Sequence, residues 1–216
     1  MNILFENDRY LVVCKPAGMV SEQEGGRGLA DLIAAQNGGY AGVIHRLDRE
    51  VSGLILCAKT PAAAAWLSSL AAGGQLKKEY LAAVAGAPEA EAGELCDLLF
   101  YDRAKNKVFS VDRTRRGVKK AILRYRTETT AEYAGIGKIA LLSVEPITGR
   151  THQIRVQFAT RKHPVLGDRR YGGPALPFGQ KEILLACRKI AFPEGDEMRE
   201  FCLEPAWKTA FFPNAK

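Results

Sequence analysis

The sequence predicts a mixed α+β protein in which strands alternate with short helices. Short apolar runs bounded by Gly, Pro and polar residues predict the strands, and capping residues frame the helices. The 216 residues contain no internal repeat, and a chain of this length buries roughly 70% of its unfolded surface. We therefore expect one domain over residues 1–216, built as two lobes that share one sheet, with the Gly- and Ala-rich segment 86–93 as a possible hinge.

Local signals define the elements in chain order. Residues 10–13 predict a strand, and Leu29–Gln36 predicts a helix that stops at Asn37-Gly38-Gly39. The apolar run 53–58 is typical of a buried strand. Thr60 as N-cap, Pro61 at the first helical position and Gly73-Gly74 at the end predict a helix through 62–72. Further strands are expected over residues 77–85, 107–111, 120–127, 139–144 and 183–186, and a loop over 171–179.

The strand over 120–127 has two unlike faces. Ala121, Leu123 and Tyr125 point one way, whereas the alternate residues point the other way and include three cations. This pattern indicates a half-buried strand whose basic face is free. The outward residues are Lys120, Ile122, Arg124 and Arg126.

The basic charge is concentrated in one segment. The chain has 31 Lys and Arg against 24 Asp and Glu, a net charge of +7 and a pI of about 9.2. Ten basic residues lie in 103–126, with Asp112 inside this stretch and Asp102 directly before it, whereas 194–204 is mostly acidic. A one-sided field of this kind suits a phosphate backbone. The alternative is a solvated hairpin whose lysines oppose edge-to-edge aggregation.

Other classes of protein lack their sequence signatures. No long apolar run and no signal peptide is present, so we expect a cytoplasmic protein without membrane contact. Five cysteines at 14, 57, 96, 187 and 202 never form C-x-x-C, which argues against a disulfide framework or a zinc site and suggests core thiols. The three histidines are not spaced for joint ligation, and we expect neither a metal nor a cofactor.

Two polar clusters point to one site. The first, which contains Asp48 between charged neighbours, precedes the buried strand 53–58, and the second, 148–155, follows the strand 139–144. A carboxylate between charged neighbours at the start of a buried strand is typical of a reactive acid, so Asp48 is a candidate. The alternative is a surface turn in which Asp48 caps the backbone. In the second cluster we expect a helix capped by Thr148 or Thr151, with Ile154 and Phe158 on its core side. The first cluster consists of His45, Arg46, Asp48, Arg49 and Glu50.

Five motifs in this order resemble those of the RluA-type pseudouridine synthases. They are K-P-A-G (15–18), H-R-L-D (45–48) with S-G-L (52–54), K-x-Y-L-A-x-V-x-G (78–86), T-G-R-T-H-Q-I-R (148–155) and H-P-x-x-G-D-x-x-Y-G (163–172). The resemblance implies a largely antiparallel central sheet with flanking helices and a cleft. It also implies isomerisation of uridine to pseudouridine in structured RNA, with a monomeric enzyme acting on a stem-loop of rRNA or tRNA.

The same resemblance assigns roles to residues. Asp48 is the catalytic carboxylate, Arg155 its ion-pair partner, and Tyr80 the aromatic that lies against the target base. Arg46 occupies the space left by the flipped nucleotide, and Ile154 and Leu185 line the pocket. Alternatives remain for two of them: Tyr80 as an ordinary sheet aromatic and Arg155 as a helix-surface cation. The remaining substrate contacts that we expect are His45, Arg150, Arg115, Arg116, Lys119 and Lys120.

Competing reactions rank lower. Hydrolysis of the glycosidic bond needs a second carboxylate or a positioned water, and the clusters offer only Glu50 and Asp168. A zinc base deaminase is excluded because its H-x-E and P-C-x-x-C pattern is missing. An inactive RNA-binding protein or RNA-folding helper of the same fold stays open, although Asp48, Tyr80 and Arg155 are all intact.

This sequence departs from the family pattern at three places. Val51 replaces the usual Thr, Gln157 the usual His, and Leu185-Ala186-Cys187 the usual L-H-A. We expect these changes to affect substrate choice more than activity. The small N-terminal RNA-binding module of many relatives is missing from this sequence, so we expect contact with RNA through 103–126.

Overall fold

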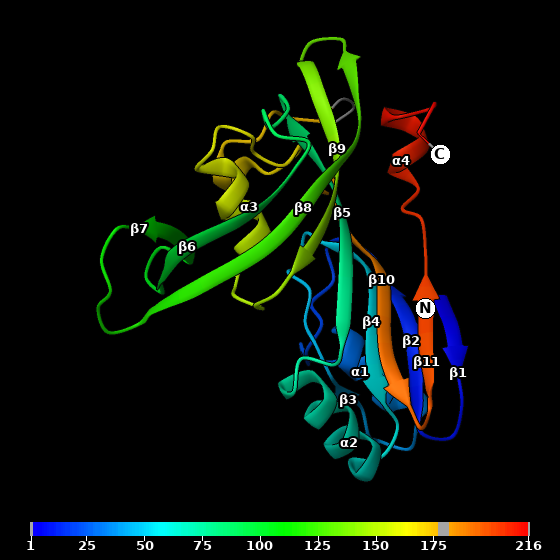
Figure 1. Ribbon diagram of the computed structural model, residues 1–216. Helices are drawn as coiled ribbons and strands as arrows, with labels where there is room; N and C mark the ends of the chain where they lie inside the picture. Colours follow the sequence, from blue (N-terminus) through cyan, green and yellow to red (C-terminus); the bar gives the residue numbers. More distant parts are fainter. Residues whose placement is uncertain (1, 177–181, 216) are drawn as a thin grey trace. The chain divides into compact units, whose positions relative to one another are not determined.

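The computed structural model describes residues 2–176 and 182–215 (Figure 1). It confirms the α+β class, with long strands and short helices. The chain divides into two compact units: Met1–Glu79 with Ala186–Pro205, and Tyr80–Leu185 with Ala206–Lys216. This division falls inside strand β5 (Lys77–Ala85), whereas segment 86–93 leads from β5 into β6 (Ala92–Asp102). A hinge at 86–93 stays a prediction.

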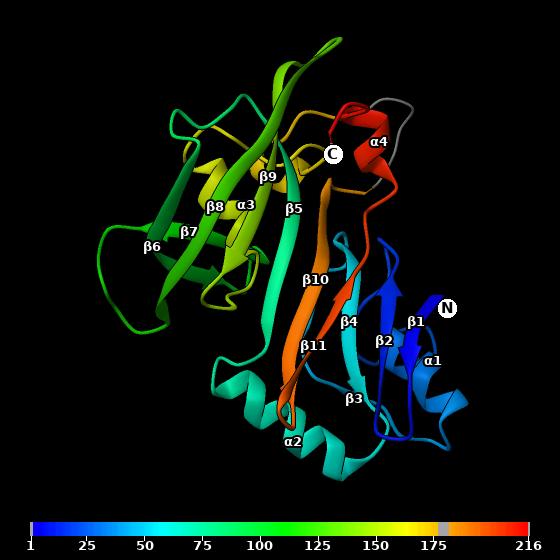
Figure 2. The ribbon, with the colours of Figure 1, turned by 45° about the vertical axis from the view of Figure 1, so that its right-hand side comes forward.

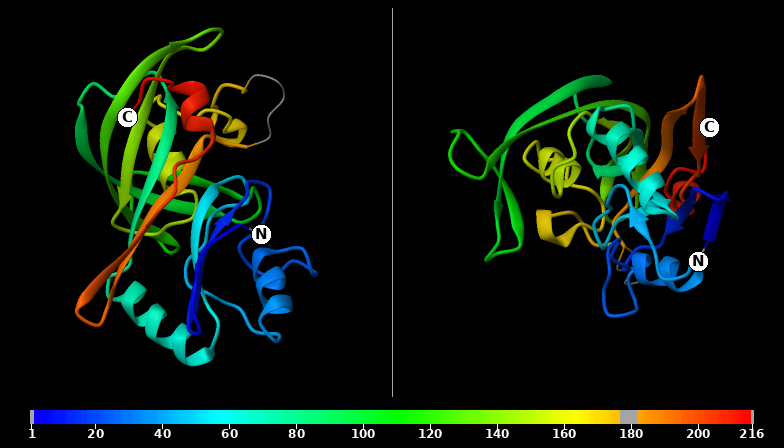
Figure 3. Two further views of the ribbon diagram at one scale, coloured as in Figure 1. Left: turned by 90° about the vertical axis from the view of Figure 1, so that its right-hand side faces the viewer. Right: turned by 90° about the horizontal axis from the view of Figure 1, so that it is seen from below.

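The first unit contains a sheet whose pairs are antiparallel except for β4 with β10. β2 pairs with β4 from Tyr10↔Ala58 to Lys15↔Gly53. Figure 3 (left) shows β10 and β11 as a long orange hairpin, which carries much of the acidic segment 194–204. The strands are β1 (Asn2–Glu6), β2 (Tyr10–Lys15), β3 (Gly42–Val43), β4 (Ser52–Ala58), β10 (Leu185–Glu194) and β11 (Glu197–Cys202).

The parallel pair explains the glycine of the S-G-L motif. Gly53 has φ +114°, which favours glycine. A Cβ at this position would lie 2.3 Å from the carbonyl oxygen of Cys187 in β10. The motif therefore permits the close approach of β10 to β4.

Both helices of the first unit begin and end where the sequence predicts (Figure 2). α1 spans Leu29–Gln36 and ends at Asn37. α2 spans Pro61–Ala72, and the Thr60 hydroxyl accepts a 3.2 Å hydrogen bond from the N–H of Ala63. Local capping chemistry thus determines these boundaries.

The second unit contains an antiparallel sheet with the order β5, β9, β8, β6, β7 (Figure 1). Strand β6 between β8 and β7 was not predicted. Because β7 and β8 both pair with β6, residues 107–127 do not form the hairpin that the sequence suggested. Segment 112–117 instead connects β8 to the edge strand β7. The strands not yet given are β7 (Lys107–Val111), β8 (Val118–Tyr133) and β9 (Gly137–Pro146).

The two faces of β8 are as predicted. Ala121 and Leu123 are fully buried, whereas Lys120 and Arg124 are exposed. Ala121 packs with Leu99 of β6 and with other buried side chains of the second unit. The complete cluster is Leu99, Val108, Ala121 and Val156, with Tyr171 against it.

The described part of the second unit also contains three short helical segments. They are α3 (Gln153–Ala159), the 3₁₀ turn η1 (Arg169–Tyr171) and α4 (Trp207–Phe211). The loop expected over 171–179 therefore follows a helical turn, and its residues 177–179 lie outside the described part of the chain. The strand expected at 183–186 begins at Leu185, and the backbone of Leu184 bonds to Ala83 of β5 and to Leu166.

The cysteines do not all occupy the core. Cys57 and Cys187 are buried, and burial raises the pKa of the Cys57 thiol to about 12. Cys96 and Cys202 are exposed, so the expectation of core thiols is wrong for these two. Across the described ranges, no helix is long and apolar enough to span a bilayer.

Candidate active site

The loop that carries Asp48 is held on both sides of that residue. Before it, the hydroxyl of Ser21 accepts from the N–H of Leu47 at 3.0 Å and donates to the carbonyl of Leu47 at 2.9 Å. After it, the carbonyl of Arg49 accepts from the N–H of Gly18 at 2.7 Å. Asp48 itself is half-buried, and its carbonyl closes a turn with the N–H of Val51 at 3.1 Å. A carboxylate on a backbone held in this way is positioned more firmly than one on a free surface turn.

Lys15 of the K-P-A-G motif is part of the same support. Its side chain is fully buried, and its ammonium donates to the carbonyls of Pro16 (2.9 Å), Met19 (2.8 Å) and Arg49 (3.3 Å). Burial lowers the pKa of Lys15 to about 8, and the charges of Asp48 and Glu50 act in the opposite direction. The K-P-A-G motif is visible in the sequence, but a lysine between a strand and a turn is only a weak signal of this supporting role.

His45 is a neutral, buried side chain. Its Nε2 accepts a 3.2 Å hydrogen bond from the N–H of Leu56, so Nδ1 carries the proton. Burial, assisted by the charge of Lys78, lowers the pKa of His45 to about 3. Nδ1 has no hydrogen-bond partner among the residues that the structure describes. A substrate contact by His45 stays a prediction.

Arg46 points away from the core, as a residue that meets RNA must. Its side chain is 66% exposed and forms a 2.7 Å ion pair with Glu22, which is also exposed. An exposed pair of this kind contributes at most about 1 kcal/mol, so RNA phosphates or bases can replace Glu22 at low cost. The role of Arg46 in nucleotide flipping stays a prediction.

In the second unit, Arg155 forms a buried ion pair with Asp168. Its Nε and one terminal nitrogen donate to the two carboxylate oxygens at 2.6 and 3.0 Å, and the side chains are 2% and 1% exposed. The guanidinium carbon also lies 5.4 Å from the ring centroid of Tyr171. The alternative of a helix-surface cation is therefore wrong for Arg155. Asp168, which is held by this pair, is also a poor second carboxylate for hydrolysis.

The cap of α3 differs from the prediction. His152 is the N-cap, in the left-handed conformation with φ 51°, and neither Thr148 nor Thr151 caps the helix with its side chain. The hydroxyl of Tyr171 lies 2.8 Å from Nδ1 of His152 and accepts from the N–H of Val108 in β7 at 2.9 Å. The T-G-R-T-H-Q-I-R motif is thereby linked to the H-P-x-x-G-D-x-x-Y-G motif and to β7.

The same motif is also joined to the basic strand β8. The hydroxyl of Thr148 accepts from the N–H of Ile122 at 2.9 Å, and Nε2 of Gln153 donates to the carbonyl of Ile122 at 2.9 Å. Nε of Arg150 donates to the carbonyl of Lys120 at 3.0 Å. The structure thus brings Arg150 next to the cationic segment that the sequence predicted to bind RNA.

Three further predicted site residues are buried. Tyr80 lies in β5 opposite Val144 and is 8% exposed, and Ile154 and Leu185 are 6% and 3% exposed. Burial fits both a pocket wall and an ordinary core position. Asp48, His45 and Arg46 belong to the first unit, whereas Tyr80, Ile154 and Arg155 belong to the second. Their convergence in one site stays a prediction.

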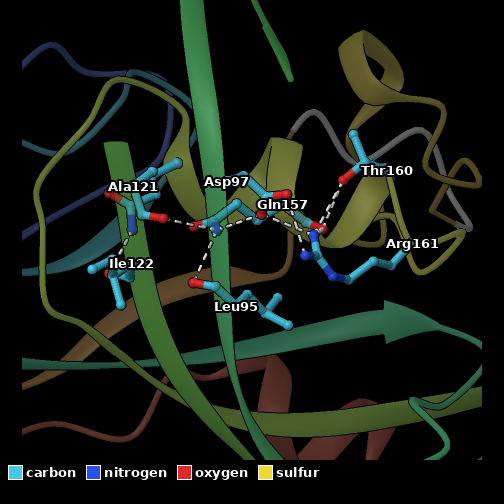
Figure 4. A network of polar contacts seen from close by, with 8 residues as sticks. Leu95, Asp97, Ala121, Ile122, Gln157, Thr160 and Arg161 are labelled. Carbon is cyan, nitrogen blue, oxygen red and sulfur yellow. Dashed lines mark hydrogen bonds and ion pairs between the residues drawn. The ribbon is translucent and has the colours of Figure 1, made fainter. Parts of the chain in front are cut away.

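Gln157, which replaces the usual histidine, binds the sheet of the second unit (Figure 4). Its Nε2 lies 2.7 Å from a carboxylate oxygen of Asp97, which also pairs with Arg161 at 2.9 Å. The carbonyls of Leu95 and Ala121 lie 3.3 and 3.4 Å from the same nitrogen. Gln157 therefore contributes to the contact between α3 and β6.

Solved structures of other proteins share this fold. The structure described as Human RNA Pseudouridylate Synthase Domain Containing 1 has a TM-score of 0.79 and 22% identity, with 98% of this chain and 86% of that chain covered. Human RNA Pseudouridylate Synthase Domain Containing 4 has a TM-score of 0.76 and 23% identity, with 95% and 89% covered. At these identities the likeness defines the class of fold, which is that of the RNA pseudouridylate synthases.

Sequence comparison agrees with the fold. A profile described as RNA pseudouridylate synthase matches residues 9–160, which is more than half of the chain. The chain belongs to the RNA pseudouridylate synthase family, and the recognition made from the motifs is confirmed.

Curated relatives carry names of the same kind. Ribosomal large subunit pseudouridine synthase D of Zymomonas mobilis is 34% identical over 80% of this chain and 56% of its own length. Ribosomal large subunit pseudouridine synthase C of Vibrio cholerae is 32% identical over 88% and 60%. An uncharacterised RNA pseudouridine synthase of Chlorobaculum parvum is 36% identical over 84% and 59%. The chain spans a little over half the length of these relatives.

Proposed function

We propose that this chain converts uridine to pseudouridine in structured RNA, with Asp48 as the catalytic carboxylate. The observation that carries the proposal is the support of the Asp48 loop by Lys15, Gly18 and Ser21 in a member of this family. The bond between the anomeric carbon and the uracil nitrogen breaks, the uracil turns, and one of its carbons bonds to the same anomeric carbon. The uracil carbon that forms the new bond loses a proton and the uracil nitrogen gains one, so product and substrate are isomers.

Asp48 has one of two roles in this reaction. It attacks the anomeric carbon, or it stabilises positive charge there and assists removal of a proton from the neighbouring ribose carbon. Both roles require an ionised carboxylate. Arg155 would keep Asp48 ionised and oriented with N–H groups other than the two that bond to Asp168. Tyr80 would stack on the flipped uracil, and Arg46 would fill the space that the flipped nucleotide leaves.

Seven cations on β7, on its two flanking connections and at the start of β8 form the proposed RNA footprint, which we name the basic patch. None of them has a carboxylate partner in the part of the chain that the structure describes. In the first unit, by contrast, cations such as Arg9, Lys59 and Lys189 pair with glutamates. Uncompensated positive charge favours a polyanion. The basic patch consists of Lys105, Lys107, Arg113, Arg115, Arg116, Lys119 and Lys120.

We also infer the kind of RNA. The relatives named as acting on the large ribosomal subunit favour a stem-loop of rRNA, with a stem-loop of tRNA as the other substrate of suitable size. Action on rRNA would place the protein in the cytoplasm. The monomeric state expected from the sequence stays a prediction.

Single-turnover conversion of an RNA that wild-type protein modifies is the decisive test. Asp48→Asn keeps the shape of the side chain but removes the charge, so the rate should fall by at least about 10⁴, equivalent to roughly 5.5 kcal/mol of barrier. Glu50→Gln is the matched control, since it removes one negative charge from the same loop and should leave the rate within a few-fold of wild type.

Each other result contradicts a specific part of the proposal. Conversion by the Asp48→Asn protein within tenfold of wild type would show that Asp48 is not the catalytic group. Free uracil as the product would indicate hydrolysis. Tight binding of RNA by the wild-type protein, with no product from any rRNA or tRNA, would indicate the inactive RNA-binding protein.

A further inference from the structure

Two phenylalanines lie side by side on the face of the β6–β7–β8 sheet that is turned away from α3. Phe100 of β6 is the direct partner of Phe109 in β7. Their chain neighbours Leu99 and Val108 are buried with Val156 of α3 on the opposite face. Since successive side chains of a strand alternate, Phe100 and Phe109 share the other face, where both are partly exposed.

Each of these rings is accompanied by a cation of the basic patch. The guanidinium carbon of Arg115 lies 4.6 Å from the ring centroid of Phe100. The ammonium nitrogens of Lys105 and Lys107 each lie 5.7 Å from the ring centroid of Phe109. All three distances are within the range of cation–π attraction.

The connection from β7 to β8 places Arg115 over its ring. Gly117 ends this connection with φ +87°, and a Cβ at that position would lie 3.5 Å from the ring of Phe100. The turn therefore folds back onto Phe100. A guanidinium that lies on an aromatic ring has a second flat face, which is available to another planar group.

We propose that this face is a stacking site for unpaired bases of the RNA, separate from the uridine pocket. The inference rests on the proposed function for the identity of the nucleic acid. Bases of single-stranded RNA stack on aromatic rings and on arginine planes, and cations beside them neutralise the phosphates between successive bases. Phe100, Phe109 and Arg115 supply the flat groups, and the rest of the basic patch supplies the charge.

The chemistry of this face favours unpaired RNA over two other polyanions. In a duplex the flat sides of the bases are covered by neighbouring base pairs, so a duplex uses the charge but not the rings. An acidic peptide has carboxylates but no planar ring system in each residue. We therefore infer that substrates carry unpaired nucleotides next to the target stem-loop.

The test compares two RNAs that contain no uridine, so that the uridine pocket is not involved. One is an adenosine oligonucleotide of roughly ten nucleotides, and the other is a G·C duplex with the same number of phosphates. Arg115→Lys keeps the charge and removes the plane. It should weaken binding of the adenosine strand by about 5- to 30-fold, equivalent to about 1 to 2 kcal/mol, without change in the salt dependence. Binding of the duplex should change less than about twofold.

Two further variants complete the experiment. Phe109→Leu should show the same selective loss. Arg9→Lys is the matched control, because Arg9 also lies over an aromatic ring, Trp66, with 4.9 Å to its centroid, but pairs with Glu194 and lies outside the basic patch; it should bind both RNAs as wild type does.

Equal loss on both RNAs, or no loss on either, would overturn the stacking site. If polyglutamate of equal charge and at equal concentration displaces the adenosine strand, this face is a binding site for an acidic protein and not a stacking site for bases. Pseudouridine formation is measured separately. A protein that makes no pseudouridine but binds adenosine strands through Arg115 would contradict the proposed function and retain the stacking site.

Discussion

Replacement of Asp168 by asparagine should destabilise the protein strongly, although the side chains of aspartate and asparagine have nearly the same shape. Asp168 accepts two hydrogen bonds from Arg155, at 2.6 and 3.0 Å, and both side chains are almost completely buried. In the Asp168→Asn variant the amide can accept one of these bonds, but its NH₂ group then faces a guanidinium N–H. The buried charge of Arg155 also loses the negative charge of this partner.

The expected cost follows from the burial of the pair. Removal of one partner from a buried ion pair costs about 3 to 5 kcal/mol. For 216 residues the entropy of unfolding is about 0.45 kcal/mol per kelvin, so the midpoint of a cooperative thermal transition should fall by roughly 7 to 11 °C. Urea unfolding followed by tryptophan fluorescence and circular dichroism measures the loss directly.

Asp97→Asn is the matched control for this prediction. Asp97 also pairs with an arginine, Arg161, at 2.9 and 3.2 Å, but the two side chains are 14% and 36% exposed. Because water reaches this pair, and the new amide can still accept the hydrogen bond from Nε2 of Gln157, the same substitution should cost less, about 1 to 2 kcal/mol. If the free energies of unfolding of the two variants differ by less than about 1 kcal/mol, burial does not determine the strength of the Arg155–Asp168 pair and the reasoning fails.

Three other predictions concern RNA binding, the aromatic of the site and pH. Replacement of four residues of the basic patch by Ala should reduce the slope of log affinity against log salt concentration by about 0.7 to 0.9 for each phosphate that the variant no longer neutralises. The same number of Ala substitutions at paired cations of the first unit should leave this slope unchanged. If slope and affinity are unaltered, the cations of the patch are solvated and do not contact RNA. Tyr80→Phe should bind RNA as wild type does, whereas Tyr80→Ala should bind more weakly by about 1 to 3 kcal/mol. Slower turnover of the Phe variant would indicate proton transfer by the hydroxyl. Equal binding and turnover of all three proteins would show that Tyr80 is not part of the site. His45 has its pKa lowered to about 3, so between about pH 3 and about pH 6.5 the unfolded chain binds a proton at this residue and the folded chain does not. As the pH is lowered through this range, folding stability should fall by about 1.4 kcal/mol per pH unit more in wild type than in His45→Gln. Parallel pH profiles of urea unfolding would contradict this assignment. The four substitutions in the patch are at Arg115, Arg116, Lys119 and Lys120.

Features that depend on neighbouring residues could be predicted from the sequence. Thr60, Pro61 and the Gly73-Gly74 pair determine both ends of α2, and alternation along 120–127 determines which side of β8 is buried. The motifs indicated the family, because their order and spacing involve nearly the whole chain. Each of these signals is local or is carried by linear order, so no knowledge of distant contacts is required.

Other features were decided by contacts between residues that are distant in the sequence. Strand β6 lies between β7 and β8, although β7 and β8 are adjacent in the chain and their pattern suggested a hairpin. Lys15 is buried against the carbonyl of Arg49, and Arg155 against Asp168, because distant segments of the chain pack together although their charged sequences are typical of an exposed surface. Likewise Gln153, not a threonine cap, joins α3 to β8, because the carbonyl of Ile122 lies within its reach. The sequence determined which residues and local elements are present, and the tertiary structure decided which charges are buried and paired, since the partners come together only when distant strands and loops pack.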